Sequence, residues 1–219
     1  MKKVIVAAGC ALAMMAGSVQ AQDGRDLRIA FDVPYEPFEY RDEDGNLTGF
    51  EVELAEAMCE EMNANCEFVI QAWDGMIPGL LARKFDLIMS SMSITEERAE
   101  RVLFSEPYYN TPGGWFGPES FNTDVTDMTA MAGKTVCVHR RTTMATYVST
   151  HLAPPVTIIL YTPADDLLLD LQAPRLAFFF VAYPVRHATV PPNARYHAPG
   201  SPVHLPHDPR APPLPPPPP

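Results

Sequence analysis

The residues best suited to chemistry lie between Asp86 and Glu100, in the segment DLIMSSMSITEERAE. A short apolar run predicts a buried strand, followed by a serine-rich turn and a helix with Thr95 as its N-cap. Arg98 stands in the first turn of that helix, where the macrodipole disfavours a cation unless an anion balances it. Backbone N–H groups, serine hydroxyls and a forked guanidinium together suit a carboxylate. The alternative is that the neighbouring glutamates simply neutralise Arg98 on a solvated face.

The elements that must position this segment alternate between strand and helix. Such alternation predicts an α/β fold with a largely parallel sheet, whose ligands bind beyond the carboxyl ends of the strands. The apolar stripe of one helix is expected to be Phe50, Leu54, Ala55, Met58 and Met62, and Asp74 is expected to cap the next helix. We expect strands at 27–31, 67–70, 86–89, 102–104, 135–138 and 176–181, a crossing strand at 111–117, and helices after 142–143 and at 164–172.

The N-terminus predicts export. Lys2 and Lys3 precede an apolar stretch, and a small-residue site ends at Ala21, which together indicate a secretory signal peptide over residues 1–21 and a periplasmic location. The apolar stretch is too short to span a bilayer. Cys10 leaves a lipid anchor as an open alternative. The formal net charge of −11 becomes −13 without the two lysines, which argues against nucleic acid as a partner.

Cys59 and Cys66 enclose the sequence MCEEMNANC. Export makes a disulfide between them reasonable. Seven residues of continuous helix rise about 10.5 Å, which exceeds the reach of a disulfide. The helix is therefore expected to end near residues 63–65, so that Cys66 can fold back.

Composition changes abruptly near residue 154. The last 66 residues hold 18 of the 24 prolines, contain no lysine and end in PPLPPPPP. Proline removes backbone donors and blocks helices and central strands, so we expect residues 187–219 to form a disordered tail. A polyproline II ligand or linker is one interpretation. The other is that a reading-frame or sequence error replaced the original C-terminus.

Five stretches resemble a known family. They read LRIAFDVPYEPFEY, GNLTGFEVELAEAMCEEMNANC, WDGMIPGLLARKFDLIMSSMSITEER, KTVCV and DDLLLDLQAPRL, within residues 27–185. They are similar to the extracytoplasmic solute-binding proteins that deliver polar amino acids to ABC transporters, above all to the group that binds lysine, arginine, ornithine and histidine. The resemblance implies a two-lobed, type II periplasmic-binding fold that closes on its ligand. Lobe 1 would be residues 22–110, and an incomplete lobe 2 residues 111–186.

The resemblance also assigns a carboxylate site. Arg98 would grip the ligand α-carboxylate in a bidentate pair. Ser91 and Ser93 would add hydroxyl or backbone contacts, and Thr143 of the second lobe would offer its backbone N–H. Taken alone, the serines could equally be capping hydroxyls.

Three further residues would meet the ligand side chain. Tyr35 and Trp73 match the aromatic positions that sandwich it, and an aromatic face attracts a cation. Asp32 would face a side-chain ammonium or guanidinium. Each has an ordinary alternative: turn packing for Tyr35, a core position for Trp73 and a turn hydrogen bond for Asp32.

The chain also departs from the family pattern. Arg141 stands where a glycine precedes the two threonines, and Cys137 replaces another glycine. Ala182 occupies the position of the aspartate that binds the ligand ammonium, and Ala177 replaces a second expected aspartate. An unpaired buried ammonium is costly, so these changes bear on whether the chain binds at all.

Three functions are compatible with these residues. The first is capture of an L-amino acid, cationic by preference, for a membrane permease of an ABC transporter, by a monomer without catalytic residues, metal or cofactor. The second is a cyclohexadienyl or arogenate dehydratase on the same fold, with Glu36 and Glu39 as candidate acids. The third is a non-functional, frameshifted copy of a binding protein.

Overall fold

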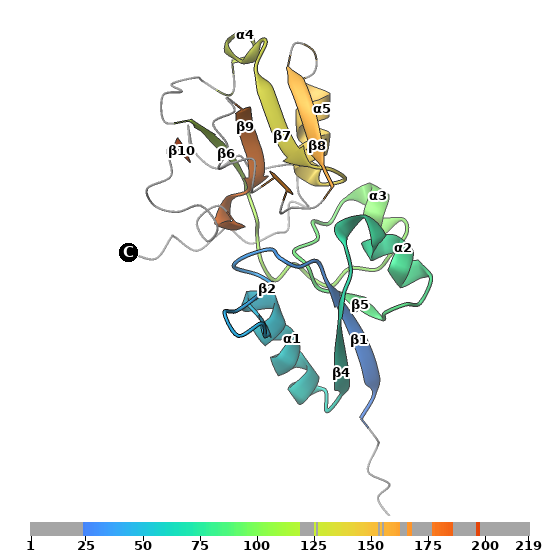
Figure 1. Ribbon diagram of the computed structural model, residues 1–219. Helices are drawn as coiled ribbons and strands as arrows, with labels where there is room; N and C mark the ends of the chain where they lie inside the picture. The colour runs from blue at the N-terminus through green and yellow to red at the C-terminus, as the bar shows by residue number, and fades with distance from the viewer. Residues whose placement is uncertain are drawn as a thin grey trace, which may run out of the picture.

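The computed structural model describes residues 24–118, 125, 127–152, 154, 156–162, 166–167, 177–185 and 196–197. These residues form two lobes, which Figure 1 shows one above the other and joined by the chain that enters β6. The predicted signal peptide, nearly all of the predicted tail and most of the helix expected at 164–172 lie outside the described residues.

A parallel sheet in the order β4-β1-β5 forms the centre of the first lobe. Successive side chains of a strand point to opposite faces. Accordingly, Ile29 and Phe31 pack on α1, whereas Ala30 packs with Met76 at the start of α2. The elements of this lobe are β1 (Asp26–Phe31), β2 (Tyr40–Arg41), β3 (Leu47–Thr48), α1 (Phe50–Glu61), β4 (Asn65–Ile70), η1 (Trp73–Gly75), α2 (Met76–Leu81), β5 (Leu87–Ile88) and α3 (Glu96–Ala99).

The buried face of α1 differs from the predicted stripe. The helix buries Glu51, Val52, Ala55 and Cys59. Three members of the predicted stripe, namely Phe50, Met58 and Met62, are exposed instead. Ala55 is buried and Leu54 packs against the core, as predicted. The prediction was wrong for the other three residues because the helix turns Glu51 and Val52 toward the core in their place.

The disulfide predicted between Cys59 and Cys66 is present, with the two Cα atoms 6.2 Å apart. The helix ends at Glu61, and Asn63 adopts a left-handed conformation with φ 50°. The Ala64 N–H then donates to the Cys59 carbonyl at 2.9 Å. This reversal returns the chain to Cys66 in β4, as the spacing of the cysteines requires.

Two other expectations in the first lobe were wrong. Residues 102–104 form no strand. Asp74 does not cap α2, whose N-cap is Gly75 and receives no side-chain hydrogen bond. Asp74 lies within η1, and its carboxylate pairs with the second lobe as described below.

The second lobe contains a mixed sheet in the order β10-β6-β9-β7-β8. β7 runs parallel to β8 and β9, whereas β6 is antiparallel to β9. A core of aromatic and aliphatic residues, Phe178 and Phe180 among them, packs between this sheet and α5. The elements are β6 (Gly113–Pro118), α4 (Met128–Met131), β7 (Thr135–His139), α5 (Thr143–His151), β8 (Thr157–Tyr161), β9 (Ala177–Ala182) and β10 (Tyr196–His197). The elements α4, β8 and β10 were not predicted from the sequence.

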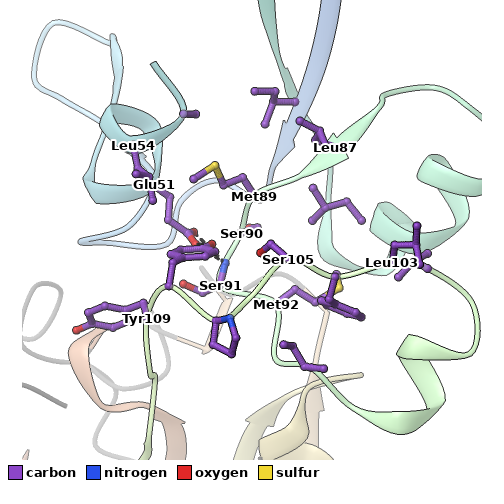
Figure 2. Close-up of a pocket in the computed structure, with 18 of the residues that line it drawn as sticks. Glu51, Leu54, Leu87, Met89, Ser90, Ser91, Met92, Leu103, Ser105 and Tyr109 are labelled. Carbon is purple, nitrogen blue, oxygen red and sulfur yellow. Dashed lines mark hydrogen bonds between the residues drawn. The ribbon is translucent and has the colours of Figure 1, made fainter. Parts of the chain in front are cut away.

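A large apolar groove opens on the first lobe, beside β5 (Figure 2). Its volume is about 810 Å³, and Met58, Met62, Leu87 and Leu103 are among its lining residues. Leu103 is 99% exposed. Of the helices in the described part of the chain, none combines the length and the apolar character that a membrane crossing needs.

Candidate functional site

The predicted site residues stand where strands and helices of the two lobes end or begin. Asp32 follows β1, Trp73 opens η1 after β4, and Ser90 and Ser91 follow β5. Thr143 is the first residue of α5 in the second lobe. The carboxyl ends of three parallel strands therefore meet the beginning of one facing helix, the edge at which open α/β sheets bind ligands.

A cavity of about 40 Å³ lies between the lobes at this edge. All seven residues predicted to touch a ligand line it, and so do four to which no ligand contact was assigned from the sequence. The lining residues are Asp32, Tyr35, Trp73, Ser90, Ser91, Ser93, Arg98, His139, Thr142, Thr143 and Met144.

Arg98 turns away from the glutamates of its own helix and toward the cleft. Its guanidinium donates to the Ser93 carbonyl at 2.8 Å and to the Arg141 carbonyl at 3.0 Å. It also lies 5.5 Å from the centroid of the Trp73 ring. Burial lowers the pKa of this guanidinium. Among the described residues no ion pair involves Arg98, which argues against the solvated-face alternative.

The predicted helix start at Thr95 is confirmed, because its side chain accepts the Arg98 N–H at 3.3 Å. The serine turn just before it is held differently. Ser90 Oγ accepts the Asp32 N–H at 3.1 Å. The Ser91 N–H donates to the carboxylate of Glu51, and Ser91 has a left-handed φ of 46°.

The two aromatic residues differ in their surroundings. Trp73 Nε1 donates across the cleft to the Arg141 carbonyl at 3.1 Å, and its ring lies 6.4 Å from that of His139. Tyr35 stacks on Phe38 at 5.7 Å, and burial raises the pKa of its hydroxyl. Trp73 is thus a cleft residue, whereas Tyr35 combines a cavity position with the turn packing of the alternative interpretation.

An ionic contact joins the lobes beside the cavity. The carboxylate of Asp74 pairs with Arg140, and its Oδ1 lies 3.5 Å from Arg141 Nε. Arg141 Nη1 also donates to the Asp74 carbonyl at 3.3 Å. Arg141 has φ 59°, a conformation that glycine adopts most easily. Arg141, in place of the glycine expected at this position, therefore adds a cation to the contact with Asp74 and keeps the left-handed conformation of the turn.

His139 is the most informative of the lining residues that the sequence analysis missed. It is the last residue of β7, and its Nε2 lies 2.6 Å from the Thr162 carbonyl. Burial lowers the pKa of its imidazole, which favours the neutral form. Asp32 was predicted from its place at the carboxyl end of a strand. The same rule could have identified His139.

The missing aspartate has no substitute among the described lining residues. Ala182 ends β9, is 1% exposed, packs in the core of the second lobe and does not line the cavity. Asp32 is the single acidic side chain that the described residues contribute to the lining. Within the same ranges, no three His, Cys, Asp or Glu side chains gather as a metal ion would require.

Such a pair of lobes, with a site between them, defines a class of hinged binding proteins. The model of the bacterial extracellular solute-binding proteins, family 3, matches residues 27–173. The chain belongs to this family, and its fold is the two-lobed type II fold that the sequence predicts.

Several relatives of the chain are named as arginine-binding proteins. The chain is 38% identical over 179 residues to the L-arginine-binding protein of Pseudomonas aeruginosa, covering 80% of this chain and 68% of the relative. It is 36% identical over 177 residues to a putative ABC transporter arginine-binding protein 2 of Escherichia coli, covering 80% and 69%. The arginine-bound form of truncated ArgBP from T. maritima superposes with a TM-score of 0.74 at 29% identity, covering 81% of this chain and 83% of that one.

Proposed function

We propose that this protein captures a cationic L-amino acid, namely arginine, lysine, ornithine or histidine, in the periplasm and presents it to the membrane permease of an ABC transporter. The observation that carries the proposal is the interlobe cavity, which brings a guanidinium, an acid and two aromatic rings together. The names of the arginine-binding relatives support the choice of ligand. In this proposal the protein acts as a monomer and performs no chemistry.

The ligand carboxylate is assigned to Arg98. In the closed form the Arg141 carbonyl accepts from this guanidinium, so a carboxylate would take over that donor. In the first turn of α5 the Ala145 N–H donates to the Thr142 hydroxyl at 3.2 Å, whereas the N–H groups of Thr143 and Met144 have no helical carbonyl to donate to and suit the same anion. Ser91 and Ser93 line the cavity nearby and supply further polar contacts.

The ligand side chain is assigned to Asp32, Trp73 and Tyr35. Asp32 is the acid of the lining, and a hydrogen bond to a charged group contributes about 1.5–3 kcal/mol net. A cation above the Trp73 or Tyr35 ring adds about 0.5–2 kcal/mol. These contacts favour a cationic side chain over a neutral one of the same length.

Binding requires the lobes to separate. A cavity of about 40 Å³ has room for little more than water, whose share of liquid volume is about 30 Å³. The contacts of Asp74 with Arg140 and Arg141 join the two lobes beside this cavity. An amino acid therefore enters an open form, and it then favours closure because it bridges the lobes.

The geometry argues against a dehydratase. Such an enzyme needs an acid aimed at the leaving hydroxyl. Neither candidate, Glu36 or Glu39, lines the cavity. Glu39 is also fully buried, with 0% of its surface exposed. Neither side chain reaches the space that a substrate would fill.

A thermal melt of the purified protein with each common amino acid at about 1 mM tests the proposal. A ligand at a thousandfold excess over its dissociation constant stabilises a protein by about 4 kcal/mol, which raises Tm by several degrees. We expect a shift with arginine, lysine, ornithine or histidine. A cooperative melt that no amino acid shifts would contradict the proposal and support the non-functional copy. Release of phenylpyruvate from prephenate would support the dehydratase.

A further inference from the structure

We propose that two buried acids, Glu39 and Glu51, are positioning residues for the binding site. Neither lines the ligand cavity. Each acts through a residue that does, since Glu51 holds the backbone of Ser91 and Glu39 holds that of Asp32 through Ser90. The role in ligand binding rests on the proposed function, but the hydrogen bonds to the backbone can be tested without a ligand.

Glu51 supports the turn from behind. It lies in α1, is 0% exposed and accepts the Ser91 N–H with both carboxylate oxygens at 2.9 Å. The hydroxyl of Tyr108 donates to the same carboxylate. Figure 2 shows Glu51 reaching from its helix toward Ser90 and Ser91. Serine does not favour the left-handed conformation of Ser91, so a hydrogen bond from outside the turn is needed to hold it.

Glu39 supports the adjacent strand end. It is also 0% exposed, and the Ser90 hydroxyl donates to its Oε1. The oxygen of that hydroxyl accepts the Asp32 N–H at 3.1 Å. A single serine therefore connects the buried acid to the residue assigned to the cationic end of the ligand. Ser90 thus joins the end of β1 to the segment that follows β5.

The charge state of the pair strengthens this arrangement. None of the ion pairs in the described part of the chain includes Glu39 or Glu51. Burial, and then the negative charge of Glu51, raise the pKa of Glu39 to about 11. Glu39 is therefore neutral near pH 7. Its contact with the Ser90 hydroxyl and the two contacts of Glu51 with the Ser91 N–H carry the positioning role.

Glu51→Gln tests the inference, with Glu53→Gln as the matched control. The control makes the same chemical change on the same helix at an exposed position. Two quantities are measured in each variant: hydrogen exchange of the Ser91 and Ala30 amides by NMR, and the dissociation constant for arginine by calorimetry. In Glu51→Gln we expect Ser91 exchange to be about tenfold faster and arginine binding about tenfold weaker. Ala30, which lies within β1, should be unchanged, and Glu53→Gln should match the wild type.

The outcomes separate positioning from simple stability. Unchanged Ser91 exchange in Glu51→Gln would overturn the inference, and so would equal acceleration at Ala30, which indicates general loosening. If the wild type binds no amino acid, the proposed function fails while the exchange result still decides the positioning role. Should Glu51→Gln not fold, Ser90→Ala removes only the hydroxyl relay. It should accelerate exchange at the Asp32 amide, and no acceleration there would overturn the inference.

Discussion

The guanidinium of Arg98 donates a hydrogen bond across the cleft to the backbone carbonyl of Arg141, with 3.0 Å between nitrogen and oxygen. The first residue comes from the lobe that holds the serine turn, and the second from the turn before α5. The closed form thus places a neutral acceptor of its own on the donor assigned to the ligand. A carboxylate competes well for this donor because an ionised acceptor binds a guanidinium more strongly than a carbonyl does.

Replacing Arg98 with alanine is expected to weaken amino-acid binding strongly. Loss of a charge-assisted pair of about 1.5–3 kcal/mol weakens binding by about ten- to a hundredfold or more. Calorimetric titration with arginine measures the change. Arg101→Ala removes an exposed arginine from the same segment and should bind like the wild type. Retained affinity in a folded Arg98→Ala variant would exclude the carboxylate role.

Asp32→Asn is expected to change selectivity. The variant loses the negative charge of the cavity lining, so arginine and lysine should bind about tenfold or more weakly, while glutamine changes little. Competition titrations with the three amino acids measure the ratio. Asp44→Asn, which neutralises an exposed acid in the β2–β3 turn, serves as the control. An equal loss for all three ligands would mean that Asp32 has a structural role only.

Asp74→Asn is expected to favour the open form. The variant weakens the contacts with Arg140 and Arg141 that join the lobes. Part-exposed ion pairs contribute about 1 kcal/mol or less, so the ratio of open to closed molecules should rise by up to about fivefold. Small-angle X-ray scattering of the unliganded protein should show a larger radius of gyration. Asp86→Asn, whose ion pair with Arg28 lies within one lobe, should leave it unchanged.

The raised pKa of Glu39 should make the free energy of unfolding depend on pH. Its folded-state pKa of about 11 lies far above the ordinary value of 4.5, so the folded protein holds a proton that the unfolded chain releases. Between these two pH values, the free energy of unfolding from this group falls as pH rises, by up to about 1.4 kcal/mol per unit. Glu39→Gln, which imitates the neutral acid, should remove that slope. Urea unfolding at pH 5.5, 7 and 8.5 measures it, and parallel profiles for the two proteins would be contrary evidence.

Removal of the disulfide should destabilise the first lobe by a modest amount. The bond between Cys59 and Cys66 closes a loop with a sequence separation of seven, for which the chain-entropy model gives about 2–3 kcal/mol. The variant Cys59→Ser/Cys66→Ser should unfold at a correspondingly lower urea concentration. A reductant should bring the wild type to the same midpoint and leave the variant unaffected. A wild type that is insensitive to reductant would show that the bond does not form in solution.

The sequence indicated which residues line the interlobe cavity because those residues follow local rules. Asp32 and Ser91 stand just after apolar strands, and Thr95 precedes acidic residues at a helix start, so position along the chain indicates position in space. His139 obeys the same rule in β7, but its strand was read only as far as residue 138. The assigned ligand contacts of these residues stay predictions.

The parts that could not be predicted depend on tertiary contacts. Nothing in the sequence around Glu51 indicates that its carboxylate meets the Ser91 N–H, 40 residues away. The residues around Asp74 indicate a helix cap, but its carboxylate forms an ion pair with Arg140 of the other lobe instead. Met58 and Met62 follow a helical period, but both side chains stay about half exposed, at 43% and 49%, in the groove beside β5. Periodicity identifies an apolar face, whereas its burial depends on what packs against it.

The groove beside β5 affects how the protein behaves in concentrated solution. Its exposed methionines and leucines present to water a contiguous apolar surface of a kind that promotes aggregation. Salts such as sulfate are excluded from the protein surface, and they therefore strengthen the association of apolar surfaces. The protein should therefore precipitate at a lower concentration of ammonium sulfate than a family member whose corresponding face is covered.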